Sequence, residues 1–338
     1  MYNKQLYNTP YHNLDISDCS FLITGGAGFV GSNIAEYLLR YNAKLVRVLD
    51  NLSNGYYENI KEFTDLPNFE FIQGDIRDLD TCKRAVEGIN YVSHQAALGS
   101  VPRSVLDPIT SNDVNVSGFV NMLYAAKDSP DLRKMVYAAS SSTYGDSAQL
   151  PKVEGSEGAP LSPYAVSKLV NELYADVFSR VYNFHTIGLR YFNIFGPKQN
   201  PDNPYAAVIP IFCKKFIDNL QPTIFGDGMT SRDFTFIENA VQANIKSLLN
   251  SDFNHHDVFN VACGDQISLA GLVKTLQEIT GKKIEAIFSA DRVGDVKHSL
   301  ASIDKICKAL SYSPQIKFRD GLDFTYKWYL SYYNTLNN

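Results

Sequence analysis

The sequence predicts an α/β fold, a doubly wound parallel sheet with a smaller C-terminal region. Three observations predict it. Short apolar runs rich in β-branched and aromatic residues alternate with helix-length amphipathic segments as far as residue 193. A glycine-rich turn follows the first apolar run and opens the first helical segment. Beyond residue 193, Pro, Gly, Asn and Asp accumulate, a composition typical of long loops around shorter elements.

The alternation is clearest when the segments are taken in chain order. Strands are expected at the apolar runs 20–24, 44–50, 69–75, 89–97, 134–140 and 185–193. Helices are expected at the periodic segments 31–42, 82–88, 118–128 and 165–182. Strands that alternate with helices form βαβ units, whose parallel strands are covered on both faces. We therefore expect a Rossmann-like domain over 19–193, to which a later segment at 233–262 returns.

Length and composition restrict the class of protein. The 338 residues have room for two domains, and 45% hydrophobic with 20% charged residues is ordinary for a globular chain. A net charge of −5 argues against a broad nucleic-acid surface. No apolar run approaches the roughly 20 residues of a membrane helix, and the polar N-terminus lacks the apolar centre of a signal peptide. We expect a cytoplasmic protein without a nucleic-acid or membrane partner.

The cysteines favour the same compartment. Their number is odd and no Cys-x-x-Cys pair occurs, so neither a zinc site nor a disulfide framework is expected. They are Cys19, Cys82, Cys213, Cys263 and Cys307. We expect buried thiols in a reducing compartment and no bound metal.

The glycine-rich turn has the chemistry of a dinucleotide site. Gly25, Gly28 and Gly31 stand directly after a strand and open a helix, where glycine allows a tight turn and a close approach to a pyrophosphate. The next strand ends in Asp50, whose carboxylate can accept hydrogen bonds from the adenosine ribose hydroxyls. Asn51 follows, and no adjacent Arg or Lys could hold a 2′-phosphate. NAD is therefore expected rather than NADP.

Further cofactor contacts are expected in the first helical turn and where the third and fourth strands end. They are Phe29, Val30, Asp75, Ile76, Gln95, Ala96 and Ala97. Asp75 has an equally good alternative as the N-cap of the helix that follows. His94 is expected to be an ordinary core or loop histidine.

A second motif has the chemistry of proton transfer. Tyr164 and Lys168 lie four positions apart in LSPYAVSK, so their side chains share one face of the predicted helix. Such a pair alone is common on solvated helices, but here a strand that ends in three serines, 140–142, precedes it. This order of glycine turn, strand-end serine and Tyr-x-x-x-Lys resembles the extended short-chain dehydrogenase/reductase family. The resemblance covers about residues 20–330 and is greatest to nucleotide-sugar 4-epimerases of the UDP-galactose/UDP-N-acetylgalactosamine type.

The resemblance implies roles for these residues. Oxidation of a sugar hydroxyl requires removal of its proton, and the resemblance gives this base role to Tyr164. A free phenol has a pKa of about 10, so we expect the Lys168 ammonium and the nicotinamide cation to lower the pKa of Tyr164. Lys168 would also bind the nicotinamide ribose. Ser140 matches the catalytic Ser or Thr, Ser142 is a second candidate, and Ser141 would cap the turn.

The resemblance also implies a substrate-binding region, mainly in 194–338. Tyr191 and Phe192 would flank the nicotinamide, with plain core packing as the alternative for both. Arg232 and Arg292 would bind the pyrophosphate, because a guanidinium fork matches phosphate oxygens. The remaining expected substrate contacts are Gly99, Ser100, Arg103, Ser140, Ser142, Asn193, Gln199, Val208, the uracil contacts Thr223, Ile224 and Phe225, the uridine-ribose contact Asp295, and Ser299.

The expected reaction is epimerisation. A 4,6-dehydratase needs an acid and a base, which the family supplies as Asp-Glu after the catalytic Thr. Ser141 and Ser142 occupy those positions here and cannot do that work. Oxidation at C4, rotation of the keto sugar and return of the hydride to the opposite face would regenerate NAD in each turnover.

Ser299 bears on the choice of sugar. The resemblance places it where epimerases restricted to non-acetylated sugars carry Tyr, so a small residue leaves room for a 2-N-acetyl group. Gly99, Ser100, Arg103 and Gln199 also resemble the subgroup that prefers N-acetylated substrates. We expect interconversion of UDP-GlcNAc and UDP-GalNAc, and activity on UDP-Glc and UDP-Gal stays open. A loop serine without such a role is the alternative for Ser299.

Other functions stay open as well. UDP-N-acetyl hexuronic acids are one alternative, with Arg103 as the donor to the C6 carboxylate. A UDP-uronate decarboxylase or a dehydrogenase that releases NADH would use the same scaffold, and a non-enzymatic NAD-binding regulator is a third class. The resemblance implies a homodimer through segments 112–127 and 163–182, although packing on the sheet explains the same apolar pattern.

Overall fold

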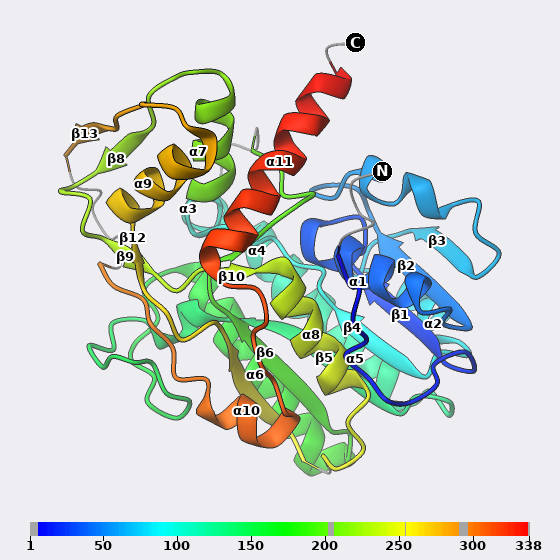
Figure 1. Cartoon of the computed structure of the whole chain (residues 1–338). Coiled ribbons are helices and arrows are strands. Elements are labelled where there is room, and N and C mark those ends of the chain that lie inside the picture. Colours follow the sequence, from blue (N-terminus) through cyan, green and yellow to red (C-terminus); the bar gives the residue numbers. More distant parts are fainter. Residues whose placement is uncertain (1–5, 202–205, 254, 291–296, 337–338) are drawn as a thin grey trace.

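The computed structural model describes residues 6–201, 206–253, 255–290 and 297–336. Its centre is a seven-stranded sheet in the order β11-β6-β5-β4-β1-β2-β3, and every neighbouring pair is parallel. Helices cover both faces, which confirms the doubly wound α/β fold (Figure 1). Within the described ranges, no helix combines the length and apolar character needed to cross a membrane.

The sheet strands follow the apolar runs of the first half, with one addition from the second. They are β1 Ser20–Thr24, β2 Leu45–Asp50, β3 Phe69–Gln73, β4 Tyr91–His94, β5 Lys134–Ser140, β6 Thr186–Tyr191 and β11 Asp257–Val261. β1 lies inside the sheet between β4 and β2, and all of its residues are buried, because helices cover a parallel sheet on both sides. β11 pairs with β6, so the chain returns to the sheet after an excursion of more than sixty residues.

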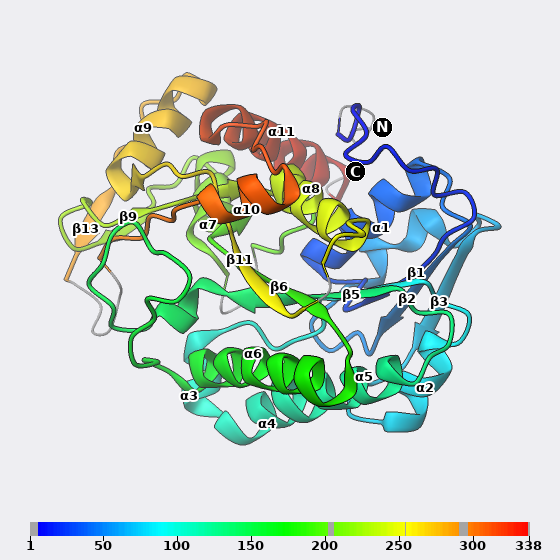
Figure 2. The same ribbon diagram turned by 90° about the horizontal axis from the view of Figure 1, so that it is seen from below.

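Two helical layers enclose the sheet. One contains α1 Phe29–Arg40 and α8 Ile237–Leu248, and the other contains α2 Leu79–Val86, α5 Gly118–Lys127 and α6 Pro163–Tyr182. Figure 2 shows the sheet between these layers, with α6 and α5 below it and α8 and α1 above. α6 begins where Ser162 accepts a hydrogen bond from the Ala165 N–H and Pro163 stands in the first turn. It ends at Asn183, which is left-handed.

Shorter elements connect the layers. They are α3 Val101–Leu106, α4 Pro108–Asn112, a π-helical turn Asp113–Ser117 continuous with α5, and 3₁₀ turns at Tyr57–Asn59, Lys61–Phe63 and Ser141–Tyr144. The π-helical turn has a structural consequence at Asn115. Its side chain accepts from the Leu98 N–H at 2.7 Å and donates to the Leu98 carbonyl at 3.2 Å. The turn therefore fixes the chain that follows β4.

The C-terminal region consists of helices and three two-stranded sheets. The sheets pair β7 Ile194–Phe195 with β10 Thr235–Phe236, β9 Ser231–Arg232 with β12 Ile267–Ser268, and β8 Thr223–Phe225 with β13 Ile287–Ser289. The helices are α7 Val208–Ile217, α9 Leu269–Thr280, α10 Asp304–Leu310 and α11 Phe318–Leu336. Figure 1 shows α7, α9, β8 and β13 gathered at one end of the molecule.

The N-terminal segment before β1 is part of the core, which its polar composition did not predict. Tyr7 is fully buried, and its hydroxyl donates to Asn33 Oδ1 at 2.7 Å on α1. Its backbone N–H donates to Glu238 on α8 at 3.2 Å. Tyr11 stacks on the ring of Tyr37. The segment thus joins α1 and α8 beside the sheet (Figure 1).

The strand order reverses at the centre of the sheet. From β1 the chain adds β2 and β3 on one side, and then β4, β5 and β6 on the other. In open α/β sheets this reversal leaves a crevice at the carboxyl ends of the central strands, where ligands bind.

Candidate active site

A cleft of about 560 Å³ opens at this crevice. Its lining includes every residue expected to contact the cofactor, from the ends of five strands (β1, β2, β3, β4 and β6) and from α1 and α6. These are Gly25, Gly28, Phe29, Val30, Gly31, Asp50, Asn51, Asp75, Ile76, Gln95, Ala96, Ala97, Tyr164, Lys168 and Tyr191. Of the expected substrate contacts, the lining includes Gly99, Ser140, Asn193 and Gln199.

The glycine turn forms a closely packed cradle between β1 and α1. Gly25 has φ +66°, and a Cβ there would lie 2.7 Å from the Ala96 nitrogen. A Cβ on Gly31 would lie 2.4 Å from the Gly25 carbonyl oxygen. The N-cap of α1, Gly28, has no side chain to satisfy the first N–H groups of the helix. Those groups and the helix dipole favour an anion in the cleft.

Asp50 ends β2 beside the cradle. Its carboxylate accepts from the Leu52 N–H at 2.8 Å and from the Ala27 N–H at 3.0 Å. Burial raises the pKa of Asp50, and these backbone donors oppose the shift. The side chain therefore braces the glycine turn and still borders the cleft, as an acceptor for ribose hydroxyls requires.

Asp75 is not a helix cap, so the alternative for this residue is wrong. Asp78 caps α2 by accepting from the Asp80 N–H. The carboxylate of Asp75 accepts from Arg77 Nη2 at 2.8 Å and from Asn51 Nδ2 at 2.8 Å. Hydrogen bonds from Arg77 lower the pKa of Asp75 to about 2. Two carboxylates, Asp50 and Asp75, therefore line this part of the cleft, and Arg77 is already hydrogen-bonded to Asp75. This arrangement is unfavourable for binding the 2′-phosphate of NADP.

The proton-transfer residues meet where β5 ends beside α6. Tyr164, Lys168 and Ser140 all line the cleft. Lys168 is buried, and its Nζ donates to the Ala138 carbonyl at 2.8 Å. The backbone N–H of Tyr164 donates to Ser104 Oγ at 3.0 Å, which fixes the first turn of α6 on α3.

The expected lowering of the Tyr164 pKa depends on the nicotinamide cation as well as on Lys168, so it stays a prediction for the NAD-bound protein. Burial raises the pKa of Tyr164, and its hydrogen bond with Ser140 opposes the rise. Burial also lowers the pKa of Lys168 to about 8, against the charge of Glu172. Because the ammonium is directed at the Ala138 carbonyl, it does not lower the pKa of the phenol in this arrangement.

The three serines at the end of β5 and directly after it, residues 140–142, differ from expectation. Ser140 is the cap, because its Oγ accepts from the Ser142 N–H at 3.2 Å. The Ser142 hydroxyl also donates to Ser140 Oγ, at 2.9 Å, and Ser142 lies outside the cleft lining. Ser141, which was expected to cap the turn, lines the cleft instead. The sequence identified the cluster but not which hydroxyl faces which way.

Tyr191 and Phe192 separate because successive side chains of a strand point to opposite sides. Tyr191 lines the cleft, donates to Gln95 Oε1 at 3.0 Å and accepts from Asn244 at 2.8 Å. Phe192 is buried in a small apolar cluster with Tyr144. Of its two expected roles, contact with the nicotinamide or core packing, this position fits core packing. His94 is also buried, with Nδ1 at 2.8 Å from the Thr24 hydroxyl.

The chain on both sides of β7 brings three polar side chains to the cleft. Asn193 has φ +40° and donates to the Asp233 carbonyl at 3.1 Å. Lys198 has φ +70°, and its Nζ donates to Glu36 at 2.8 Å. Gln199 donates to the Ile194 carbonyl at 3.3 Å, while its buried Oε1 has no hydrogen-bond partner among the described residues.

Most other expected substrate contacts lie outside the cleft lining. Ser100 caps α3, Arg103 donates to Asn54 at 3.2 Å, and Val208 begins α7. Ile224 is buried in the main core, whereas Thr223 is exposed and Phe225 is half-buried. Arg232 donates to the Ser231 carbonyl, which also accepts from the Ser299 N–H at 3.1 Å. Arg292 and Asp295 lie outside the described residues.

The cleft also includes residues that the sequence analysis missed. The loop after Asp50 contributes Ser53, Asn54, Gly55 and Tyr56, and the loop after β7 contributes Lys198. The run NLSNGY, which follows directly on the strand-end carboxylate, was a usable signal, because Asn, Ser and Gly cluster in loops at strand ends.

Known proteins match this architecture over nearly the whole chain. A profile of the NAD dependent epimerase/dehydratase family matches residues 21–262. The chain belongs to this family. Its sequence is 35% identical over 309 residues to a putative UDP-glucose 4-epimerase of Methanocaldococcus jannaschii, covering 91% of this chain and 97% of that protein.

Two solved structures of the family superpose closely. One is a UDP-N-acetylglucosamine 4-epimerase from Methanobrevibacter ruminantium M1 in complex with UDP-N-acetylmuramic acid, with TM-score 0.88, 36% identity and coverage of 93% of this chain and 99% of that one. The other is a UDP-glucuronic acid 4-epimerase from Bacillus cereus with UDP-glucuronic acid and NAD, with TM-score 0.85, 29% identity and coverage of 93% and 99%.

NAD is the cofactor of this family, and the cleft fits it. The cradle at Gly25 and Gly31 has no room for side chains, as close approach of a pyrophosphate to the backbone requires. Asp50, Lys168 and Tyr191 line the same cleft. NAD would supply the hydride acceptor and donor for the reaction.

Proposed function

We propose that this protein is an NAD-dependent UDP-sugar 4-epimerase that interconverts UDP-GlcNAc and UDP-GalNAc. The observation that carries the reaction class is the meeting of Tyr164, Ser140 and Lys168 with the glycine cradle in one cleft. The family and its structural neighbours support the same reaction class.

The side chains divide the work of proton transfer. Removal of the C4 hydroxyl proton requires a base within hydrogen-bond reach, and the Tyr164 phenol is the group in this cleft suited to give and take that proton. Its hydrogen bond with Ser140 places a second hydroxyl where the reacting oxygen can be oriented. Lys168, adjacent on α6, supplies a positive charge that favours phenolate when it turns from Ala138 towards the cleft.

Gln199 supports an N-acetylated sugar. Its Oε1 is a buried acceptor without a described partner, and the residue lines the cleft. A buried acceptor is costly unless a ligand satisfies it, and the amide N–H of a 2-acetamido group is a suitable donor. The neighbour at 36% identity is a UDP-N-acetylglucosamine 4-epimerase, which supports the same substrate class.

Ser299 supports the choice of sugar through its size. Its backbone N–H donates to the Ser231 carbonyl. The carbonyl of the next residue in this segment, Leu300, accepts from the Lys152 N–H at 2.8 Å. The segment is thus held from two sides, so a bulky side chain at position 299 could not be accommodated by simple displacement. Ser299 lies outside the cleft lining, so its effect on the room for a 2-acetamido group is part of the proposal.

A UDP-hexuronate is the second candidate substrate. Arg103 is the observation that favours it, since its guanidinium donates to Asn54, a residue of the cleft lining. The Bacillus cereus neighbour is a UDP-glucuronic acid 4-epimerase. A carboxylate at C6 would draw on this arginine, whereas a neutral C6 hydroxyl would not need it.

A substrate panel tests the proposal. Purified protein is incubated with UDP-GlcNAc, UDP-Glc and UDP-GlcNAcA, and the products are identified by NMR. We expect the highest kcat/KM for UDP-GlcNAc with UDP-GalNAc as product, and no net NADH or CO2. Conversion of the uronate alone would contradict the substrate assignment, and stoichiometric NADH or CO2 would indicate a dehydrogenase or a decarboxylase.

We also propose that the chain forms a homodimer through the outer face of α6. Leu173, Val177 and Val181 form an exposed stripe at helical spacing, and Ile109 on the neighbouring α4 is 81% exposed. Figure 2 shows α3, α4 and α6 on the same side of the sheet. Leu173→Glu with Val177→Glu is expected to halve the mass measured by sedimentation equilibrium, and an unchanged mass would contradict this interface.

A further inference from the structure

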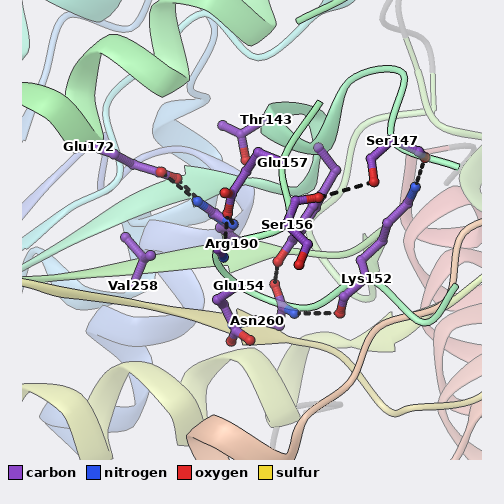
Figure 3. A network of polar contacts seen from close by, with 12 residues as sticks. Thr143, Ser147, Lys152, Glu154, Ser156, Glu157, Glu172, Arg190, Val258 and Asn260 are labelled. Carbon is purple, nitrogen blue, oxygen red and sulfur yellow. Dashed lines mark hydrogen bonds and ion pairs between the residues drawn. The ribbon is translucent and has the colours of Figure 1, made fainter. Parts of the chain in front are cut away.

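Arg190 on β6 lies between two carboxylates behind the cleft. Its Nε donates to Glu172 Oε1 at 2.9 Å and its Nη2 donates to Glu172 Oε2 at 2.7 Å. Its Nη1 forms an ion pair with Glu157, which comes from the loop before α6. Arg190 is 2% exposed and Glu172 is 7% exposed. Figure 3 shows the guanidinium between these two carboxylates.

The same network continues away from the cleft. The ring of Tyr144 lies 4.9 Å from the Arg190 guanidinium, and its hydroxyl donates to Asn260 Oδ1 at 2.7 Å. Asn260 donates in turn to the Lys152 carbonyl at 3.0 Å (Figure 3). The guanidinium is therefore held on several sides, and its position is set by the packed core rather than by solvent.

Glu172 lies on the same face of α6 as Tyr164 and Lys168. Tyr164, Lys168 and Glu172 follow one another at intervals of four, so each lies one turn from the next. Lys168 and Glu172 are both buried on the side of α6 that faces the sheet. Burial raises the pKa of Glu172, and Arg190 opposes that shift more than Lys168 does.

We propose that Arg190 is a positioning residue for proton transfer. By engaging both oxygens of Glu172, it keeps that carboxylate from drawing the Lys168 ammonium along α6 and away from Tyr164. Through Glu157 it also fixes the loop that leads into the first turn of α6. This role rests on the proposed function, in which Tyr164 transfers the proton of the sugar hydroxyl.

The geometry shows why the arginine is needed. Lys168 is one turn from Glu172 and interacts with it electrostatically, so it is the next cation available to that carboxylate. With Arg190 present, the Lys168 Nζ instead donates to the Ala138 carbonyl on β5. A buried charge left without its partner is strongly unfavourable. Loss of Arg190 would therefore turn Glu172 towards Lys168.

Other titratable groups around these residues do not account for the same effect. His94 on β4 faces Lys168, and burial lowers its pKa to about 3, so it is neutral. Tyr137 on β5 faces Glu172 and Arg190, and Tyr144 faces Arg190, and burial raises the pKa of both phenols. Among the described residues, the charge of Glu172 acts on Lys168, and the charges of Arg190 and Glu157 act on Glu172.

Two single substitutions test the proposal because they change the charge in opposite directions. Arg190→Gln leaves an unpaired carboxylate near Lys168 and Tyr164, which raises the pKa of both groups. In the pH profile of kcat/KM, the acidic limb should then move to higher pH by roughly one unit. Glu172→Gln removes the carboxylate, and the limb should move to lower pH. The double variant Arg190→Gln with Glu172→Gln should return the limb towards the wild-type position.

A second readout does not depend on turnover. The tyrosinate absorbance of each NAD-loaded protein is titrated with pH, and the difference from the same protein with Tyr164→Phe isolates Tyr164. The Tyr164 titration should shift to higher pH in Arg190→Gln and to lower pH in Glu172→Gln. Glu70→Gln, which removes a carboxylate from the Arg47 ion pair on β2 and β3, is the matched control and should shift neither curve.

The outcomes separate the possibilities. Arg190→Lys keeps the charge and should restore most of the wild-type limb even if it lowers the melting temperature. If Arg190→Gln does not fold, Glu172→Gln alone decides through its shift to lower pH. Unchanged limbs and titrations, or shifts in the same direction for both variants, would overturn the proposal. Near-normal turnover of Tyr164→Phe would instead overturn the proposed function, while the absorbance titration still tests Arg190.

Discussion

The two sides of the cleft differ in how the fold builds them. The cofactor side is made mainly from the ends of β1, β2, β3, β4 and β6, which the parallel sheet brings to one edge. The substrate side depends on loops and two-residue strands that pair distant segments, such as Arg232 with Ile267. All residues expected on the cofactor side line the cleft, whereas Arg232, Ser299 and residues 223–225 do not. Local sequence rules therefore predict the first side well and the second poorly.

The largest effect is expected at the point where the two sides meet. Tyr164→Phe removes the hydroxyl that transfers the proton and should lower kcat by about 1000-fold. Because the ring remains, the amount of NAD that copurifies and the affinity for the UDP-sugar should change little. Turnover measured with UDP-GlcNAc checks the loss, and the NAD content of the purified protein is the control. A variant that keeps near-normal turnover would contradict the role of Tyr164.

A substitution in the glycine cradle is the most direct way to weaken cofactor binding. Gly31→Ala places a methyl group 2.4 Å from the Gly25 carbonyl oxygen, so the turn must shift. We expect NAD affinity to fall about 100-fold, or about 2.8 kcal/mol, which is within the roughly 1 to 3 kcal/mol that overpacking costs. Gly88→Ala is the control, because a Cβ there meets nothing within 4 Å although its φ is +69°. Calorimetric titration with NAD that shows equal affinity for both variants would contradict the cradle assignment.

The substrate side is sharpened by a change of selectivity rather than by a loss of activity. Ser299→Tyr should lower kcat/KM for UDP-GlcNAc about 50-fold relative to that for UDP-Glc, because the ring occupies the room of the acetyl group. Ser299→Ala is the matched control and should leave the ratio as it is. An unchanged ratio for the tyrosine variant would mean that position 299 does not face the sugar.

The smallest effect is expected in stability, at a buried carboxyl on the substrate side. Asp233 is fully buried and accepts from the Cys263 N–H at 3.0 Å and the Ala301 N–H at 3.2 Å. Burial raises its pKa from 3.8 to about 6. The folded state then binds more protons than the unfolded state between these values, so its contribution to stability is present below pH 4 and is lost as the pH rises through about 6.

Denaturant unfolding of the wild type and Asp233→Asn checks this sign. The stability of the wild type relative to the variant should fall by about 1 to 3 kcal/mol between pH 4 and pH 7. Other buried carboxyls cancel in the comparison because both proteins contain them. A difference that stays constant, or that grows with pH, would show that the Asp233 carboxyl is not destabilised by burial.

The sequence predicted the sheet because each strand is a short apolar run with its own turn signals. It predicted Asp50 because the residue ends an apolar run that is recognisable as a strand from its own sequence. It missed the burial of Tyr7, since a tyrosine in a polar stretch carries no periodic signal, and only contacts with α1 and α8 bury it. It also misassigned Ser141 and Ser142, because a single 3₁₀ turn decides which hydroxyl meets the cleft. Contacts between distant segments cannot be derived from either segment alone.

One isotope experiment tests the central claim most directly, that the sugar is oxidised and reduced at C4 within one cleft. UDP-GlcNAc labelled with deuterium at C4 is converted in ordinary water, and the product is analysed by NMR and mass spectrometry. The account predicts that UDP-GalNAc keeps the deuterium at C4 in every molecule, because the hydride returns to the carbon that it left. Product with protium from solvent at C4 would contradict it.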